Sequence, residues 1–399
     1  MKLRISPFLM LCVMGGLAIF SSTMAKNPAL PLFIRSMGVP LSTVGFIAAA
    51  STVVGILVSL PAGILSDIIG RRRVILTAAL VFATAPFLYL LITQPWQLVI
   101  IRIYHGLATA ILGPVAMAAV ADTYEKGRGE RMGWYSSATM VGRFLAPLVG
   151  GMLIFGDNFR WVYVADGVAG VLALLAAIRL PLDTNVSGMT RAAFGEQLRK
   201  YRQEIGFIFG HGGILATSGI EAVQYFAYGA IETFLPIFLS EKRHFTTWEI
   251  GLLFTAQIVA AALTKPIMGK LSDRYGRVPM IVAGLVIGGV STALLVVSPN
   301  FILTMALIAV FGLGLATVTA STSALVADLS RAQGRGAAMG VLSSIMDVGQ
   351  STGPMITGVV VASFSYEPAF AGVGILMVVV SIIYGTAMRR VPRGARVTP

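Results

Sequence analysis

Charged side chains stand inside long apolar stretches of this sequence, where an ion is costly and usually has a function. The six that we select are Lys26, Arg102, Arg143, Glu221, Glu232 and Asp347. A carboxylate in such a place can take up and release a proton, and a nearby cation can displace that proton or hold an anionic ligand. The residue types therefore predict proton exchange and the binding of a small molecule.

We expect Glu232 to be the main proton carrier and Asp347 the second. Pro31 and Pro236 occupy matching places in the two halves described below, so Lys26 and Glu232 should lie at similar depths. These two residues are expected to form a salt bridge or to share a substrate site. The alternative is that each meets a partner in its own half. The embedded cations are compatible with an anionic substrate, so the sequence leaves open whether the substrate is anionic, cationic or neutral.

Residue patterns for catalysis, metal binding and nucleotide binding are missing from the sequence. There is one cysteine, Cys12, and the histidines His105, His211 and His244 stand far apart, so neither residue type offers a ligand spacing. The glycine pair in "FGLGLA" (311–316) lies in an apolar helical stretch with no strand before it, unlike a nucleotide-binding loop. We therefore expect no enzyme, no cofactor and no metal, and the proton gradient as the energy source.

The composition is that of a membrane protein. Of 399 residues, 56% are hydrophobic and 12% are charged, against about 25% charged in a soluble domain. Apolar stretches long enough to cross a bilayer as helices recur along the whole chain. We predict an all-α integral membrane protein with twelve transmembrane helices in two pseudo-symmetric six-helix bundles. The predicted spans are 6–32, 41–66, 73–94, 96–122, 131–155, 161–179, 212–240, 247–270, 278–298, 301–328, 336–363 and 369–388.

The distribution of basic residues predicts the orientation. Most of the 30 lysine and arginine residues fall at the N-terminus, in the even-to-odd connections and in the C-terminal tail. Only Arg35, Arg160, Lys242 and Arg243 fall on the opposite side. By the positive-inside rule both termini are cytoplasmic, so the net charge of +13 needs no nucleic acid to explain it. The first span resembles a signal peptide, but its cleavage would leave an odd number of spans.

The chain contains an internal repeat. Gly63, Asp67, Gly70, Arg71 and Asp122 reappear in the same order as Gly269, Asp273, Gly276, Arg277 and Asp328. "GRGERMGWYSSATMVGRFLAPLVGG" (127–151) likewise aligns with "GRGAAMGVLSSIMDVGQSTGPMITG" (334–358). We expect two bundles, 1–180 and 206–399, joined by a cytoplasmic linker at 181–205. An even number of spans in each half gives parallel repeats, as in transporters that rock about a central site.

The duplicated "G-x-L-S-D-x-x-G-R" turn and the six-plus-six plan resemble the major facilitator superfamily over essentially the whole chain. The resemblance implies a charged latch at the cytoplasmic ends, with Asp67 facing a helix end of the other half and Arg71 pairing with Asp122. Asp273, Arg277 and Asp328 would repeat it. The alternative is a basic turn that only sets the topology.

Two further segments resemble motifs of that superfamily. In "LVIIRIYHGLATA" (98–110), Arg102 and Gly106 match a pattern of proton-coupled exporters, whereas His105 and Ala108 depart from it. The resemblance implies that Arg102 assists proton coupling, although it would otherwise snorkel or brace neighbouring helices.

"GRFLAPLVGG" (142–151) resembles an antiporter signature. Its matching residues are Gly142, Pro147, Gly150 and Gly151. Ala146 replaces a usual glycine, and Arg143 has Gln350 as its counterpart, which suggests substrate contact. Close packing and a bend at proline are the alternative meaning of these residues.

The predicted function is proton-coupled efflux of a small organic molecule or drug by alternating access. The expected setting is the bacterial inner membrane, with a functional monomer, a small-molecule substrate, protons and the lipid bilayer as partners, and no nucleic acid. Three alternatives remain: an uptake permease or lipid flippase of the same fold, a non-transporting membrane sensor or scaffold, and an integral-membrane enzyme.

Overall fold

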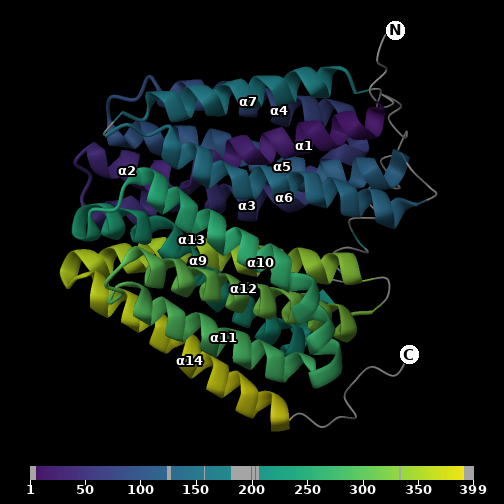
Figure 1. Ribbon diagram of the computed structural model, residues 1–399. Helices are drawn as coiled ribbons and strands as arrows, with labels where there is room; N and C mark the ends of the chain where they lie inside the picture. Colours follow the sequence, from purple (N-terminus) through teal and green to yellow (C-terminus); the bar gives the residue numbers. More distant parts are fainter. Residues whose placement is uncertain are drawn as a thin grey trace. The chain divides into compact units, whose positions relative to one another are not determined.

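A computed structural model describes residues 6–123, 127–156, 158–180, 206–331 and 334–390, together with Arg199 and Gln203. Within these ranges the chain is helical, with no strand longer than an isolated bridge. The helices, coloured along the chain in Figure 1, are α1 (Pro7–Met24), α2 (Ala29–Ser36), α3 (Leu41–Ile69), α4 (Arg71–Tyr89), α5 (Pro95–Thr123), α6 (Arg128–Met152), α7 (Arg160–Ile178), α9 (Gly212–Arg243), α10 (Thr247–Tyr275), α11 (Arg277–Leu295), α12 (Phe301–Leu329), α13 (Arg335–Ser363) and α14 (Tyr366–Arg390).

The twelve predicted spans are confirmed to within a few residues at most ends. In the described ranges, ten segments are long and apolar enough to cross a membrane, and α1 and α2 together form one of them. Helices α6 and α13 complete the set of twelve. Both are long enough, but each carries many glycine, serine and threonine residues together with embedded charges.

The first predicted span, 6–32, matches one membrane-spanning segment, Pro7–Ser36, but two helices form that segment. Helix α1 ends at Met24, and α2 begins at Ala29. The residues between them include Pro28, which lacks a backbone N–H and cannot continue the hydrogen-bond ladder of a helix. The interruption places Lys26 in the turn between two helices.

The helices pack into two compact units. Unit 1 comprises Met1–Val39, Ala50–Thr190 and His244–Thr255. In it α1 packs against α6 and α7, and α4 packs against α5 and α7. The predicted linker at 181–205 lies outside the described residues, apart from Arg199 and Gln203.

Unit 2 comprises Pro40–Ala49, Arg191–Arg243 and Ala256–Pro399. Its helix α9 packs against α12, α13 and α14. Helix α11 lies between α12 and α14, as Figure 1 shows. The units differ from the predicted bundles at two helix starts. Pro40–Ala49, which includes the start of α3, belongs to unit 2, and His244–Thr255, which includes the start of α10, belongs to unit 1.

Close backbone contacts inside unit 1 recur at the matching places inside unit 2, in agreement with the sequence repeat. A side chain on Gly142 of α6 would overlap the carbonyl oxygen of Gly16 on α1. At the matching place in unit 2, a side chain on Gly349 of α13 would overlap the carbonyl oxygen of Ala222 on α9. Small residues let membrane helices approach this closely. These glycines therefore determine how the helices of each unit meet.

Candidate functional site

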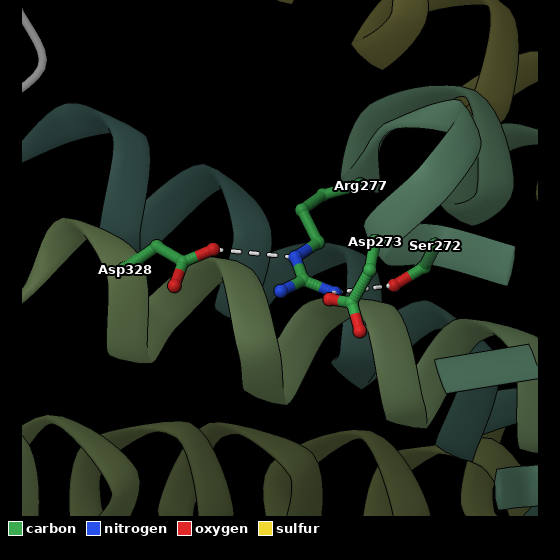
Figure 2. A network of polar contacts seen from close by, with 4 residues as sticks. All are labelled: Ser272, Asp273, Arg277 and Asp328. Atoms are coloured by element: carbon green, nitrogen blue, oxygen red, sulfur yellow. Dashed lines mark hydrogen bonds and ion pairs between the residues drawn. The ribbon is translucent and has the colours of Figure 1, made fainter. Parts of the chain in front are cut away.

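The second copy of the repeated charged turn forms a compact network (Figure 2). The Arg277 guanidinium forms ion pairs with Asp273 on α10 and with Asp328 at the end of α12, the latter with Nε and Oδ2 3.2 Å apart. Its Nη1 also donates to the Ser272 hydroxyl at 2.7 Å. The arginine thus links the ends of three helices, since Arg277 itself begins α11.

The first copy shares the serine contact. Arg71 donates to the Ser66 hydroxyl at 2.7 Å, which matches the contact of Arg277 with Ser272. Both serines are buried. The side chains of Asp67 and Asp122, and the surroundings of Gly63, lie outside the described residues. The serine role was missed in the sequence, although both copies of the "LSD" tripeptide carry it.

Each turn depends on a glycine with a positive φ. Gly70 has φ 94° before α4, and Gly276 has φ 98° before α11. L side chains rarely adopt this backbone conformation, so the two glycines allow the sharp reversal between consecutive helices. By contrast, Gly269 has open space around it and no such backbone constraint.

Three of the selected charges belong to unit 2. Glu232 on α9 is half-buried and accepts a hydrogen bond from Gln350 Nε2 of α13 at 3.3 Å. Glu221, also on α9, is buried and accepts a hydrogen bond from the Thr322 hydroxyl of α12. Asp347 on α13 is half-buried. The structure therefore places Glu232 beside Gln350, which is the counterpart of Arg143 in the second repeat.

The other three charges belong to unit 1. Arg102 on α5 is only 3% exposed and donates to the Ser51 hydroxyl of α3 at 2.5 Å. Lys26 is half-buried, whereas Arg143 on α6 is exposed. Because Lys26 is in unit 1 and Glu232 is in unit 2, their pairing stays a prediction.

Arg102 adjoins a buried group of polar aromatic side chains. Tyr89 of α4 and Tyr163 of α7 stack in parallel, with ring centroids 4.5 Å apart. His105 of α5 packs edge-on against Tyr89. Asp166 of α7 completes the group and is 0% exposed. Asp166 is not among the six charges selected from the sequence.

The glycine-rich segment of α6 is a packing surface in unit 1. A side chain on Gly251 of α10 would overlap the carbonyl oxygen of Pro147, and one on Gly151 would overlap that of Thr247. The Thr247 hydroxyl also donates to the Gly151 carbonyl oxygen at 2.9 Å. Gly150 packs against Met24.

The same contacts recur in unit 2. A side chain on Gly45 of α3 would overlap the carbonyl oxygen of Pro354, and one on Gly358 of α13 would approach that of Leu41. Backbone packing at helix starts therefore explains the glycine and proline pattern in both repeats.

The arrangement can bind protons and charged molecules, since it holds carboxylates, hydroxyls and cations inside helical units. Among the described residues, no three His, Cys, Asp or Glu side chains gather in a group that could hold a metal ion.

Known proteins resemble the chain over most of its length. The family model for the Major Facilitator Superfamily matches residues 11–248 and 217–399. Multidrug resistance protein 2 of Bacillus subtilis is 27% identical over 356 residues, covering 86% of each chain. Multidrug resistance protein MdtG of Enterobacter lignolyticus is 26% identical over 392 residues, covering 95% of this chain and 90% of its own. A bacterial homolog of the human lysosomal transporter Spinster has the same fold, with a TM-score of 0.81, 18% identity and 98% of each chain covered.

Proposed function

We propose, because the chain belongs to the Major Facilitator Superfamily, that this multi-pass membrane transporter exports a small organic molecule in exchange for protons. Membership establishes a transporter that sits in lipid, binds small molecules and is not an enzyme. Drug export is suggested by the names of two relatives, which are multidrug resistance proteins. Antiport needs a group that releases its proton when the substrate binds and takes up a proton when the substrate leaves.

The observation that carries the proposal is the set of carboxylates and cations inside the helices. Glu221 and Arg102 are buried, and Glu232 and Asp347 are half-buried, in spans that are otherwise apolar. A scaffold gains nothing from such costly groups, whereas a transporter uses them to bind protons and substrate. We assign proton exchange first to Glu232, then to Asp347 and Glu221, with Lys26 and Arg143 as substrate contacts.

The charged turns act as a latch in this proposal. The ion pairs of Arg277 with Asp273 and Asp328 hold together helix ends that must move between outward-open and inward-open states. Arg71, Asp67 and Asp122 are the corresponding group of the first repeat. The prevalence of lysine and arginine at these connections supports cytoplasmic termini and the inner membrane as the location. The proposed functional unit is the monomer.

Replacing Asp328 with asparagine tests the latch. Because the Asp328 side chain is 58% exposed, losing its pair with Arg277 should change the free energy of unfolding by less than about 1 kcal/mol. The transport rate should nevertheless fall by about tenfold, equivalent to about 1.4 kcal/mol in the barrier. Glu367→Gln, an exposed acid at the start of α14, is the control. Normal transport by Asp328→Asn would contradict the latch and would mean that Arg277 only sets the topology of the chain.

An uptake permease or lipid flippase is the second candidate. The packing of Gly142, Pro147 and Gly151 explains the antiporter-like pattern without reference to direction. The embedded cations Lys26 and Arg102 would also suit an anionic nutrient or lipid headgroup. This candidate is favoured if deletion of the gene starves cells of a nutrient or alters their envelope lipids.

Everted membrane vesicles with an acid interior test the proposed function. A pH-sensitive dye reports the gradient while ethidium, a neutral drug and an anionic drug are added in turn. An exporter carries the compound inward and protons outward, so one compound class should collapse the gradient. Glu232→Gln should abolish this response, and Glu241→Gln, an exposed acid on the same helix, should keep it. If no compound disturbs the gradient while a nutrient or lipid binds the purified protein, the second candidate replaces the first.

A further inference from the structure

Helix α7 carries a fully buried acid in unit 1. The Asp166 side chain is 0% exposed, and neither carboxylate oxygen has a hydrogen-bond partner among the described residues. The Ser21 hydroxyl of α1 lies close to it but outside hydrogen-bond geometry. An ionised carboxylate without donors is very costly inside protein, so this group must be neutral or balanced by a nearby cation.

Two tyrosines lie near both this acid and the arginine of α5. Tyr89 and Tyr163 are each 1% exposed, and their rings are parallel within 1°. Both phenols interact electrostatically with Asp166 and with Arg102. The Tyr163 hydroxyl has no hydrogen-bond partner within the described part of the chain, and the Tyr89 hydroxyl lies close to Arg102 but outside hydrogen-bond geometry. A phenol can donate to a carboxylate or accept from a guanidinium, so the pair can connect the two charges.

The other titratable groups near this cluster come from α5 and from the turn after α1. His105 is 3% exposed, and neither ring nitrogen has a partner within the described ranges. It lies within electrostatic range of Arg102 and Lys26. The Phe82 ring of α4 packs edge-on against the imidazole, with ring centroids 5.6 Å apart. The facing charges on neighbouring elements are thus both basic, and Asp166 is the one acid among the described residues of this group.

We propose that Asp166 is a proton-binding site of the transport cycle, with Arg102 as its counter-charge and with Tyr89 and Tyr163 linking the two. This inference rests on the proposed proton coupling and adds a site in unit 1, separate from Glu232 in unit 2. In the protonated state the carboxyl group is neutral and needs no counter-charge. On release, the proton passes to water and the negative charge is balanced by the Arg102 guanidinium, so the cluster changes by one unit of charge.

A buried acid with only a packing role would not exchange protons, and infrared spectroscopy separates the two cases. Purified full-length protein in lipid bilayers is moved from mildly acid to mildly alkaline buffer. The carbonyl stretch of protonated carboxyl groups is recorded as a difference spectrum. One band of the wild type should be missing in Asp166→Asn and present in Glu367→Gln, the exposed control acid of unit 2. An unchanged spectrum in Asp166→Asn would overturn the proposal.

A second variant covers the case in which Asp166→Asn does not fold. Asp166→Glu keeps the carboxyl group and places it one methylene further from the helix. Its band should be present at a shifted frequency, and a band at the wild-type frequency would overturn the assignment as well.

The dye assay distinguishes this inference from the proposed function. In everted vesicles, Asp166→Asn should release protons on ethidium or drug addition at least about tenfold more slowly than wild type. Antiport by the wild type together with an unchanged Asp166→Asn spectrum overturns the site and keeps the function. Absence of antiport from the wild type overturns the function, and with it the transport role of Asp166, whatever the spectrum shows.

Discussion

Replacing Arg102 with glutamine is expected to lower proton-coupled transport by at least about 100-fold, which is about 2.7 kcal/mol in the barrier. The guanidinium is 3% exposed and donates to the Ser51 hydroxyl. It also interacts with Tyr89 and His105. A buried hydrogen bond to a charged group contributes about 1.5–3 kcal/mol, and glutamine supplies neither the charge nor the reach. Vesicle transport, corrected for the amount of protein in the membrane, measures the effect.

Two variants show whether the charge of Arg102 or its packing matters. Arg102→Lys keeps the charge but loses the planar donor fork, so it should retain part of the activity. Ser51→Ala removes one acceptor and leaves the cation in place, so its transport should stay within about tenfold of wild type. Wild-type transport by Arg102→Gln would mean that the arginine only braces α5 against α3.

The second large effect is expected from Gly142→Leu. A side chain at this position meets the carbonyl oxygen of Gly16 and the backbone nitrogen of Phe20, and neither backbone atom can move without shifting α1. Overpacking of this kind costs about 1–3 kcal/mol or more. The purified variant should therefore unfold at a lower temperature and elute from size exclusion as a broadened or aggregated species.

The same helix offers a matched control for Gly142→Leu. Gly133 of α6 has no heavy atom within 4 Å of the position that a side chain would take. Gly133→Leu should leave stability unchanged or raise it by up to about 1 kcal/mol, because leucine favours the helix. Equal stability of Gly142→Leu and wild type would show that α1 and α6 do not need their close approach.

The helices and the repeat could be predicted from the sequence because both depend on residues that are close together along the chain. An apolar span of sufficient length has few alternatives in a membrane, and the repeated turn carries its own glycine and ion-pair residues. The contact of Arg277 with Asp328 was implied by the resemblance to the Major Facilitator Superfamily. The break before α2 was missed, although Pro28 was a visible signal for it.

Burial within each unit could not be predicted in the same way. Tyr163 and Asp166 are near neighbours on α7, whereas Tyr89 is distant in sequence and joins them only when α4 and α7 pack. An isolated aspartate in an apolar span does not indicate which side of its helix faces the protein. Arg143 shows the converse, because a cation inside a motif segment lies on an exposed side of α6.

Transport by the purified protein in proteoliposomes tests proton-coupled export most directly. Vesicles with an acid interior are supplied with external ethidium or with the drug class that collapsed the gradient in everted membranes, and uptake of that compound is followed. We expect accumulation against its gradient that needs the pH difference and disappears with a protonophore. Uptake that only equilibrates the compound, at the same rate with and without the pH difference, would contradict proton-coupled export.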